Sequence, residues 1–210
     1  MKSLVLMALV FVCGWAVMSL EILGGRILTP YFGGDIYVWG SVIGVFLLSL
    51  SIGYFVGGKL SRHSPRPIYL SVVIFVAAVL VAVLTRLHEK VNNAVFDWLV
   101  AETLDGERWG CLVAAAILFL LPTTLLGMVS PYAVRLATTD VCSVGERAGV
   151  LYAVSTIGSV LGCLMTSFYL ILWFHMDTIL LLTSGLLVAA ALIFPGFYRM
   201  SSLPEKGQSE

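Results

Sequence analysis

Apolar residues fill six long segments of this chain, and short polar stretches separate them. A membrane-spanning helix needs about 20 mostly apolar residues, and every one of these segments is long enough. We therefore predict transmembrane helices at residues 4–28, 37–58, 67–87, 109–136, 148–173 and 177–198. Together they form one all-α, polytopic membrane domain over residues 1–200, with halves at about 1–90 and 109–200. Residues 201–210 are polar and are expected to form a disordered cytoplasmic tail.

Composition agrees with a protein that lies almost entirely in a membrane. Of its 210 residues 60% are hydrophobic and only 11% are charged, whereas a soluble domain usually carries about a quarter charged residues. The formal net charge is zero, which argues against nucleic acid as a partner and leaves the lipid bilayer. The four cysteines lie far apart without metal-ligand or redox spacing, so we expect no metal site and no cofactor.

The distribution of basic residues predicts the orientation. Basic residues favour the cytoplasmic side of a membrane. With both termini inside, eight basic residues fall inside and four outside: Lys2, Lys59, Arg62, Arg66, Arg135, Arg147, Arg199 and Lys206, against Arg26, Arg86, Lys90 and Arg108. We predict a multi-pass protein of the cell inner membrane with both termini cytoplasmic. Residues 91–104 have helical apolar spacing and are expected to form either a short amphipathic helix on the outer surface or an ordered loop.

The middle helices of the two halves resemble each other. Gly44–Gly57 aligns with Gly149–Gly162 at a constant offset of 105, and five of fourteen positions are identical. With six helices, these two segments run in opposite directions across the membrane. This favours a 3+3 inverted repeat, an arrangement found in many secondary transporters. The alternative explanation is that glycine-rich apolar helices are alike in composition.

Glycines four residues apart mark sites where helix backbones approach closely. Such spacing involves Gly40, Gly44, Gly53, Gly57, Gly158 and Gly162. Helix packing is the plain interpretation. A functional interpretation adds that the second span of each half crosses the other near the centre and lines a site there.

Charged residues in the first span are the strongest candidates for a site. Glu21 and Arg26 are costly in hydrocarbon unless paired or hydrated, and they lie about 140° apart on an ideal helix. They form either a substrate or proton site or a structural ion pair near the outer boundary. The other candidates for substrate binding are Tyr31, Ser51, Ser130, Thr156 and Ser159. No nucleophile or metal set accompanies them, so we assign no catalytic residue and do not expect an enzyme.

Three segments carry a resemblance to a known family. They are Glu21–Gly33 with its Gly25-Arg26-Ile27-Leu28 run, Leu126–Leu136, and Gly149–Gly162. In these segments the chain resembles the membrane domain of the bacterial fused membrane (MFS-like)/spermidine-synthase-like family. Full-length members resemble aminopropyltransferases in a following Rossmann-like domain. The nucleotide-binding glycines and acidic proton acceptor of that domain have no counterpart among these residues, so the resemblance assigns no aminopropyl transfer to them.

Two functions follow from these observations. The first is a transporter-like module for a small solute, for which the resemblance suggests a polyamine or related amine. The second is a non-catalytic membrane anchor or partner subunit for a separately encoded aminopropyltransferase (spermidine synthase)-like enzyme. Association into a homo-oligomer is compatible with both.

Overall fold

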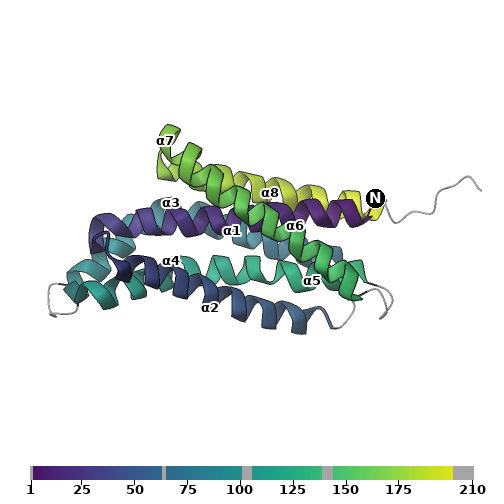
Figure 1. The fold of residues 1–210 in the computed structure, drawn as a ribbon, viewed down its shortest axis with the longest axis horizontal. Helices are drawn as coiled ribbons and strands as arrows, with labels where there is room; N and C mark the ends of the chain where they lie inside the picture. Colours follow the sequence, from purple (N-terminus) through teal and green to yellow (C-terminus); the bar gives the residue numbers. More distant parts are fainter. Residues whose placement is uncertain (1, 63–64, 101–105, 139–143, 201–210) are drawn as a thin grey trace, which may run out of the picture.

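The computed structural model describes residues 2–62, 65–100, 106–138 and 144–200 (Figure 1). Its helices are α1 (Lys2–Phe32), α2 (Ile36–Leu60), α3 (Pro67–Val95), η1 (Phe96–Val100), α4 (Gly106–Gly127), α5 (Val129–Ala137), α6 (Val144–Met165), η3 (Thr166–Leu170), α7 (Ile171–Trp173) and α8 (Met176–Met200). Within these residues, six helical stretches are long and apolar enough to cross a membrane: Ser3–Phe32, Ile36–Leu60, Pro67–Leu99, Gly106–Ala137, Val144–Trp173 and Met176–Tyr198. The prediction of an all-α protein with six spans is confirmed, and each predicted span lies inside one stretch.

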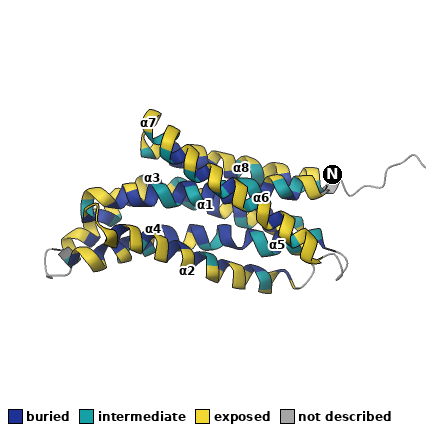
Figure 2. Ribbon diagram, in the orientation of Figure 1, coloured by how far each residue is buried: buried dark blue, intermediate teal, exposed yellow. Residues whose placement is uncertain are grey.

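The spans form an elongated bundle in which the first and fourth spans supply most of the interior (Figures 1 and 2). The second span, α2, packs on α4, while the fifth span begins with α6, which packs on α1. The third and sixth spans, α3 and α8, pack on each other. Burial follows this order, since 61% of the fourth span but only 17% of the fifth is buried. The fifth span therefore presents most of its surface to the surroundings.

The first span is longer than its sequence suggested. The helix α1 continues through Gly25 and through Pro30 in its last turn, and it ends at Phe32. Gly33 adopts a φ of 83°, and its N–H donates to the Thr29 carbonyl at 3.0 Å. A glycine in this left-handed conformation ends a helix without a steric penalty. Gly33, rather than Pro30, therefore stops the first span.

The predicted separate amphipathic helix at residues 91–104 is wrong where the structure describes it. Residues 91–95 continue α3 without a break and η1 follows directly, while 101–104 lie outside the described residues. His88, Asn92 and Val95 are buried on one face of this extension. The Asn92 Nδ2 donates to the Ile27 carbonyl at 3.3 Å. Packing against α1 therefore prolongs the third span.

The fourth span is interrupted between α4 and α5, as its two prolines suggested. Pro122 lies inside α4, and Pro131 is the third residue of α5. At the junction, the Met128 N–H donates to both Thr124 and Leu125 carbonyls at 3.2 Å. Proline removes a backbone donor, so the surrounding helices must satisfy the carbonyls that it frees.

A buried tyrosine fixes α5 to the connection between α2 and α3. The Tyr132 hydroxyl donates to the Arg66 carbonyl at 3.1 Å and accepts from the Arg66 N–H at 3.0 Å. We expect Tyr132→Phe to lower the free energy of unfolding by about 1–2 kcal/mol, because both backbone groups lose their partner. Thermal unfolding in detergent would measure this, with the half-exposed Tyr69→Phe as control. Equal melting temperatures for the two variants would contradict it.

The two ends of the bundle differ in charge. At the end where α1 begins, the exposed charged side chains are mostly basic: Lys59, Arg62, Arg66, Arg135 and Arg147, with Glu146. We call this the basic end. The opposite end exposes both signs: Arg26, Arg86, Lys90 and Arg108, with Asp35, Glu89, Asp97, Glu107 and Asp177. This end also exposes four of the five tryptophans, Trp39, Trp98, Trp109 and Trp173, so we call it the tryptophan end. Exposed tryptophans at the ends of apolar helices are typical of a membrane interface.

Candidate functional site

Glycines allow α6 to lie directly on the backbone of α1. A Cβ added at Gly158 would overlap the Phe11 carbonyl oxygen, and one added at Gly162 would overlap that of Trp15. The Ser19 hydroxyl donates to the Gly162 carbonyl at 3.4 Å across the same contact. Only residues without a side chain permit so close an approach.

The contact of α2 with α4 is built in the same way. A Cβ added at Gly53 would overlap the Thr124 carbonyl oxygen, and one at Gly57 would lie 2.6 Å from that of Met128. Gly40 and Gly44, on the same helix, face away and have no heavy atom within 4 Å of such a Cβ. Four of the six predicted packing glycines thus make close contacts within the described residues, and these two do not.

The two helix contacts have the same register. Thr124 lies 113 residues after Phe11, and Met128 lies 113 residues after Trp15. The glycines that meet them lie 105 residues apart. Two further contacts follow the same two offsets. A Cβ added at Gly14 would overlap the Ser155 carbonyl oxygen, and one added at Gly127 would lie 3.2 Å from that of Leu50. Each second span therefore packs on the first span of the other half, instead of the two second spans crossing each other as predicted.

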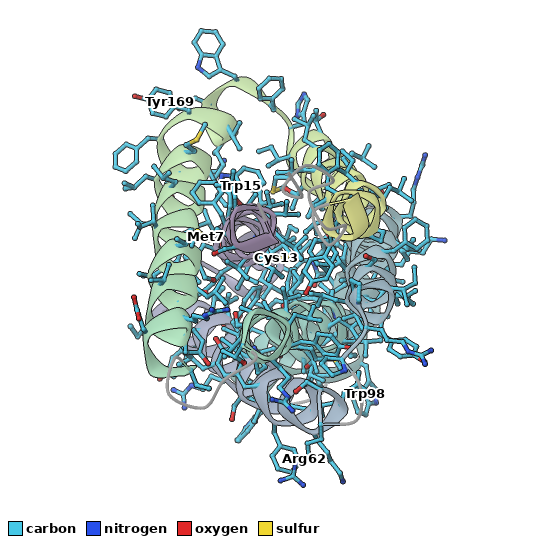
Figure 3. The ribbon with its side chains drawn as sticks, turned by 90° about the vertical axis from the view of Figure 1, so that its right-hand side faces the viewer. Met7, Cys13, Trp15, Arg62, Trp98 and Tyr169 are labelled. Atoms are coloured by element: carbon cyan, nitrogen blue, oxygen red, sulfur yellow. The ribbon has the colours of Figure 1, made fainter. Side chains whose placement is uncertain are left out.

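A cavity of about 80 Å³ lies where these contacts meet, and we call it the seam cavity. Most of its lining follows the same two offsets. Three pairs come from the first and fourth spans, 113 residues apart: Cys13 with Leu126, Gly14 with Gly127, and Val17 with Ser130. Two pairs come from the second and fifth spans, 105 residues apart: Leu50 with Ser155, and Tyr54 with Ser159. In the end-on view of Figure 3, Cys13 lies on the side of α1 that faces the bundle interior.

Hydroxyl groups supply the polar part of the seam cavity. The Ser159 hydroxyl donates to the Gly14 carbonyl at 3.2 Å. Ser130 and Ser155 make no side-chain hydrogen bond within the part of the chain that the structure describes. Tyr54 is 48% exposed and forms one edge. No charged side chain is among the residues that line the cavity. The site is therefore neutral, with hydroxyl groups free to donate or accept.

Two of the seven predicted binding residues, Ser130 and Ser159, line the seam cavity. Ser51 and Thr156 are exposed on outward faces, and the Thr156 hydroxyl donates to the Tyr152 carbonyl at 2.8 Å. Cys13 and Tyr54 were missed by the sequence reasoning. An alignment of the first with the fourth span at an offset of 113 would have pointed to the first-span lining.

The remaining predicted residues, Glu21, Arg26 and Tyr31, lie on α1 outside this lining. Glu21 is partly buried and Arg26 is exposed. They form no ion pair with each other in the described structure, where the ion pair that does form joins His88 Nε2 to Asp177 Oδ1 at 3.1 Å. Glu21 follows Cys13 and Val17 at intervals of four, which places it on the same helix face, one turn beyond the cavity. The structural ion pair considered for Glu21 and Arg26 does not form.

The fold defines the class of protein. Six apolar helices, each long enough to cross a bilayer, make this chain a multi-pass membrane protein. Comparison with known proteins found no matching family model, no matching curated protein and no matching solved structure. The family resemblance of the three sequence segments stays a prediction.

Proposed function

We propose that this protein is a transporter-like module that moves a small solute across the cell inner membrane. The observation that carries the proposal is the repeated register of the two helix contacts around the seam cavity. It supports a 3+3 inverted repeat, because unrelated helix pairs have no reason to share two constant offsets. Secondary transporters built in this way place the substrate site at the interface between the repeats.

The packing also suits alternating access. Each half contributes a first span and a second span to the walls of the cavity, so the solute site belongs to both halves. The contacts between halves at Gly53, Gly57, Gly158 and Gly162 place backbone against backbone without interlocking side chains. Such a surface lets one half rock against the other around a fixed site.

Glu21 is the residue proposed to couple the movement to charge. It lies one helical turn from the cavity, on the face of α1 that lines it. An ionisable residue within a membrane span is a functional candidate by default, because its burial is costly. In this proposal Glu21 carries a proton or balances a cationic solute, and Arg26 and Tyr31 lie further toward the tryptophan end.

Uptake by proteoliposomes tests the proposal, with a solute panel that pairs cationic putrescine with uncharged acetamide. We expect uptake of at least one class above protein-free liposomes. We expect Glu21→Gln to reduce that uptake about tenfold or more, equivalent to about 1.4 kcal/mol in the barrier. Glu107→Gln is the matched control, since Glu107 is exposed in the first turn of α4. Full uptake by Glu21→Gln, or no uptake of either solute, would overturn the proposal.

The basic end supports a second candidate, a membrane anchor or partner subunit. Its exposed basic groups, which include Arg62 and Arg135, are typical of a cytoplasmic face. Such a surface attracts a partner with an acidic patch, here a separately encoded aminopropyltransferase-like enzyme. Purification from its source cells in mild detergent would test this. Co-purification that is lost in Arg62→Glu supports the anchor, and its absence in the parent contradicts it. Labelling of an Arg62→Cys variant from outside intact cells would contradict the orientation.

A further inference from the structure

We infer that the seam cavity binds a small, uncharged molecule that both donates and accepts hydrogen bonds. This inference rests on the proposed function, because it names the class of solute for the same site. Three features carry it: the volume of the cavity, the arrangement of its hydroxyl groups, and the absence of a charged group from its lining.

The volume limits the ligand to a few non-hydrogen atoms. A cavity of about 80 Å³ is about half the size of the roughly 150 Å³ cavity that encloses benzene in an engineered protein. It is also close to the share of liquid volume taken by two or three water molecules, at about 30 Å³ each. A polyamine is too long to be enclosed, whereas a molecule of the size of acetamide or urea fits.

The hydroxyl groups are gathered over bare backbone. The position that a Cβ of Gly14 would occupy lies 3.0 Å from both the Ser155 and the Ser159 Oγ atoms. Because glycine has no side chain, this space stays open and the two hydroxyls border it. Ser130 adds a third hydroxyl from α5. A ligand seated there meets groups that can rotate to donate or accept, as an amide or an alcohol requires.

The electrostatics favour an uncharged ligand. Burying an ion without a counter-charge costs several kcal/mol, and the lining offers hydroxyls, one thiol and apolar groups. Glu21 lies a turn away and is not among the lining residues. A cation of the same shape as the neutral ligand would therefore lose its hydration without gaining a carboxylate.

Protection of Cys13 from alkylation tests the inference. Cys13 is 4% exposed and lines the cavity, so replacement of Cys111, Cys142 and Cys163 by alanine leaves one reporter thiol. The reagent is methyl methanethiosulfonate, and mass spectrometry follows the reaction. Acetamide and acetamidinium are compared, because they share a planar shape and differ in charge. At twice its dissociation constant, a protecting ligand slows the reaction about threefold, since only the free protein reacts.

We expect acetamide to protect and acetamidinium not to protect. Ser130→Ala combined with Ser155→Ala should abolish protection, while Ser71→Ala on α3, whose hydroxyl donates to the Pro67 carbonyl, should preserve it. Equal protection by the cation, no protection by acetamide, or full protection in the double variant would overturn the inference. Equilibrium dialysis with radiolabelled acetamide decides the same comparison if the thiol proves unreactive.

Acetamide flux into proteoliposomes separates this inference from the proposed function. Protection without flux would keep the binding site and remove the transport proposal. Flux without protection would keep transport and place the solute elsewhere in the bundle.

Discussion

Gly158→Ala is expected to lower the melting temperature of the purified protein by about 4–8 °C. The added methyl group would overlap the Phe11 carbonyl oxygen and lie within 3.0 Å of two further backbone atoms of that residue. Backbone atoms of a helix cannot rotate away as a flexible side chain can, so α1 and α6 must separate. Forced overpacking typically costs about 2 kcal/mol. For a chain of this length, each kcal/mol corresponds to about 2–4 °C.

The matched control is Gly149→Ala on the same helix. Gly149 has no heavy atom within 4 Å of an added Cβ. Alanine is the better helix former by about 1 kcal/mol, so this variant should melt at the same temperature as the parent or slightly above it. Gly53→Ala and Gly44→Ala should repeat the contrast on α2, since only Gly53 meets a neighbouring backbone. Identical melting temperatures within each pair would contradict the packing described here.

Phe119→Ala is expected to destabilise the bundle by about 2–3 kcal/mol. Phe119 is 0% exposed, and its ring centroid lies 5.5 Å from that of Phe46 on α2. In a bilayer the unfolded reference is also apolar, so little transfer energy is lost and the cost comes from the empty space. A residual cavity of about 100 Å³ costs about 2.4 kcal/mol at about 24 cal/mol per Å³.

Phe55→Ala separates packing from composition. Phe55 is also a phenylalanine of a membrane span, but it is 75% exposed on α2. Lipid can fill the space that its ring leaves, so we expect a change below about 0.5 kcal/mol, typical of a surface site. Unfolding in a mixed detergent series would measure both variants. Equal losses for Phe55 and Phe119 would mean that the interior of the bundle is not packed as described.

The sequence predicted the spans well because the bilayer constrains them strongly. Helices that cross hydrocarbon must be apolar over about 20 residues and must satisfy their own backbone hydrogen bonds. It predicted the ends less well. Nothing in the local pattern distinguished Pro30, which α1 tolerates in its last turn, from Gly33, whose positive φ ends the helix. The extension of α3 past residue 91 likewise depends on packing against α1, through contacts such as that of Asn92 with Ile27.

By itself, the sequence determined the class of protein: an all-helical membrane domain of six spans, with basic residues gathered at one end. It also singled out the glycine pairs, because spacing by four is visible in one dimension. Only the tertiary structure decided that Gly53 and Gly57 contact another helix while Gly40 and Gly44 do not. It also decided that Ser130 and Ser159 share a cavity that Ser51 and Thr156 do not reach. The physical reason is that a helix face becomes an interior only when a second helix covers it, and which helix covers it depends on residues more than a hundred positions away.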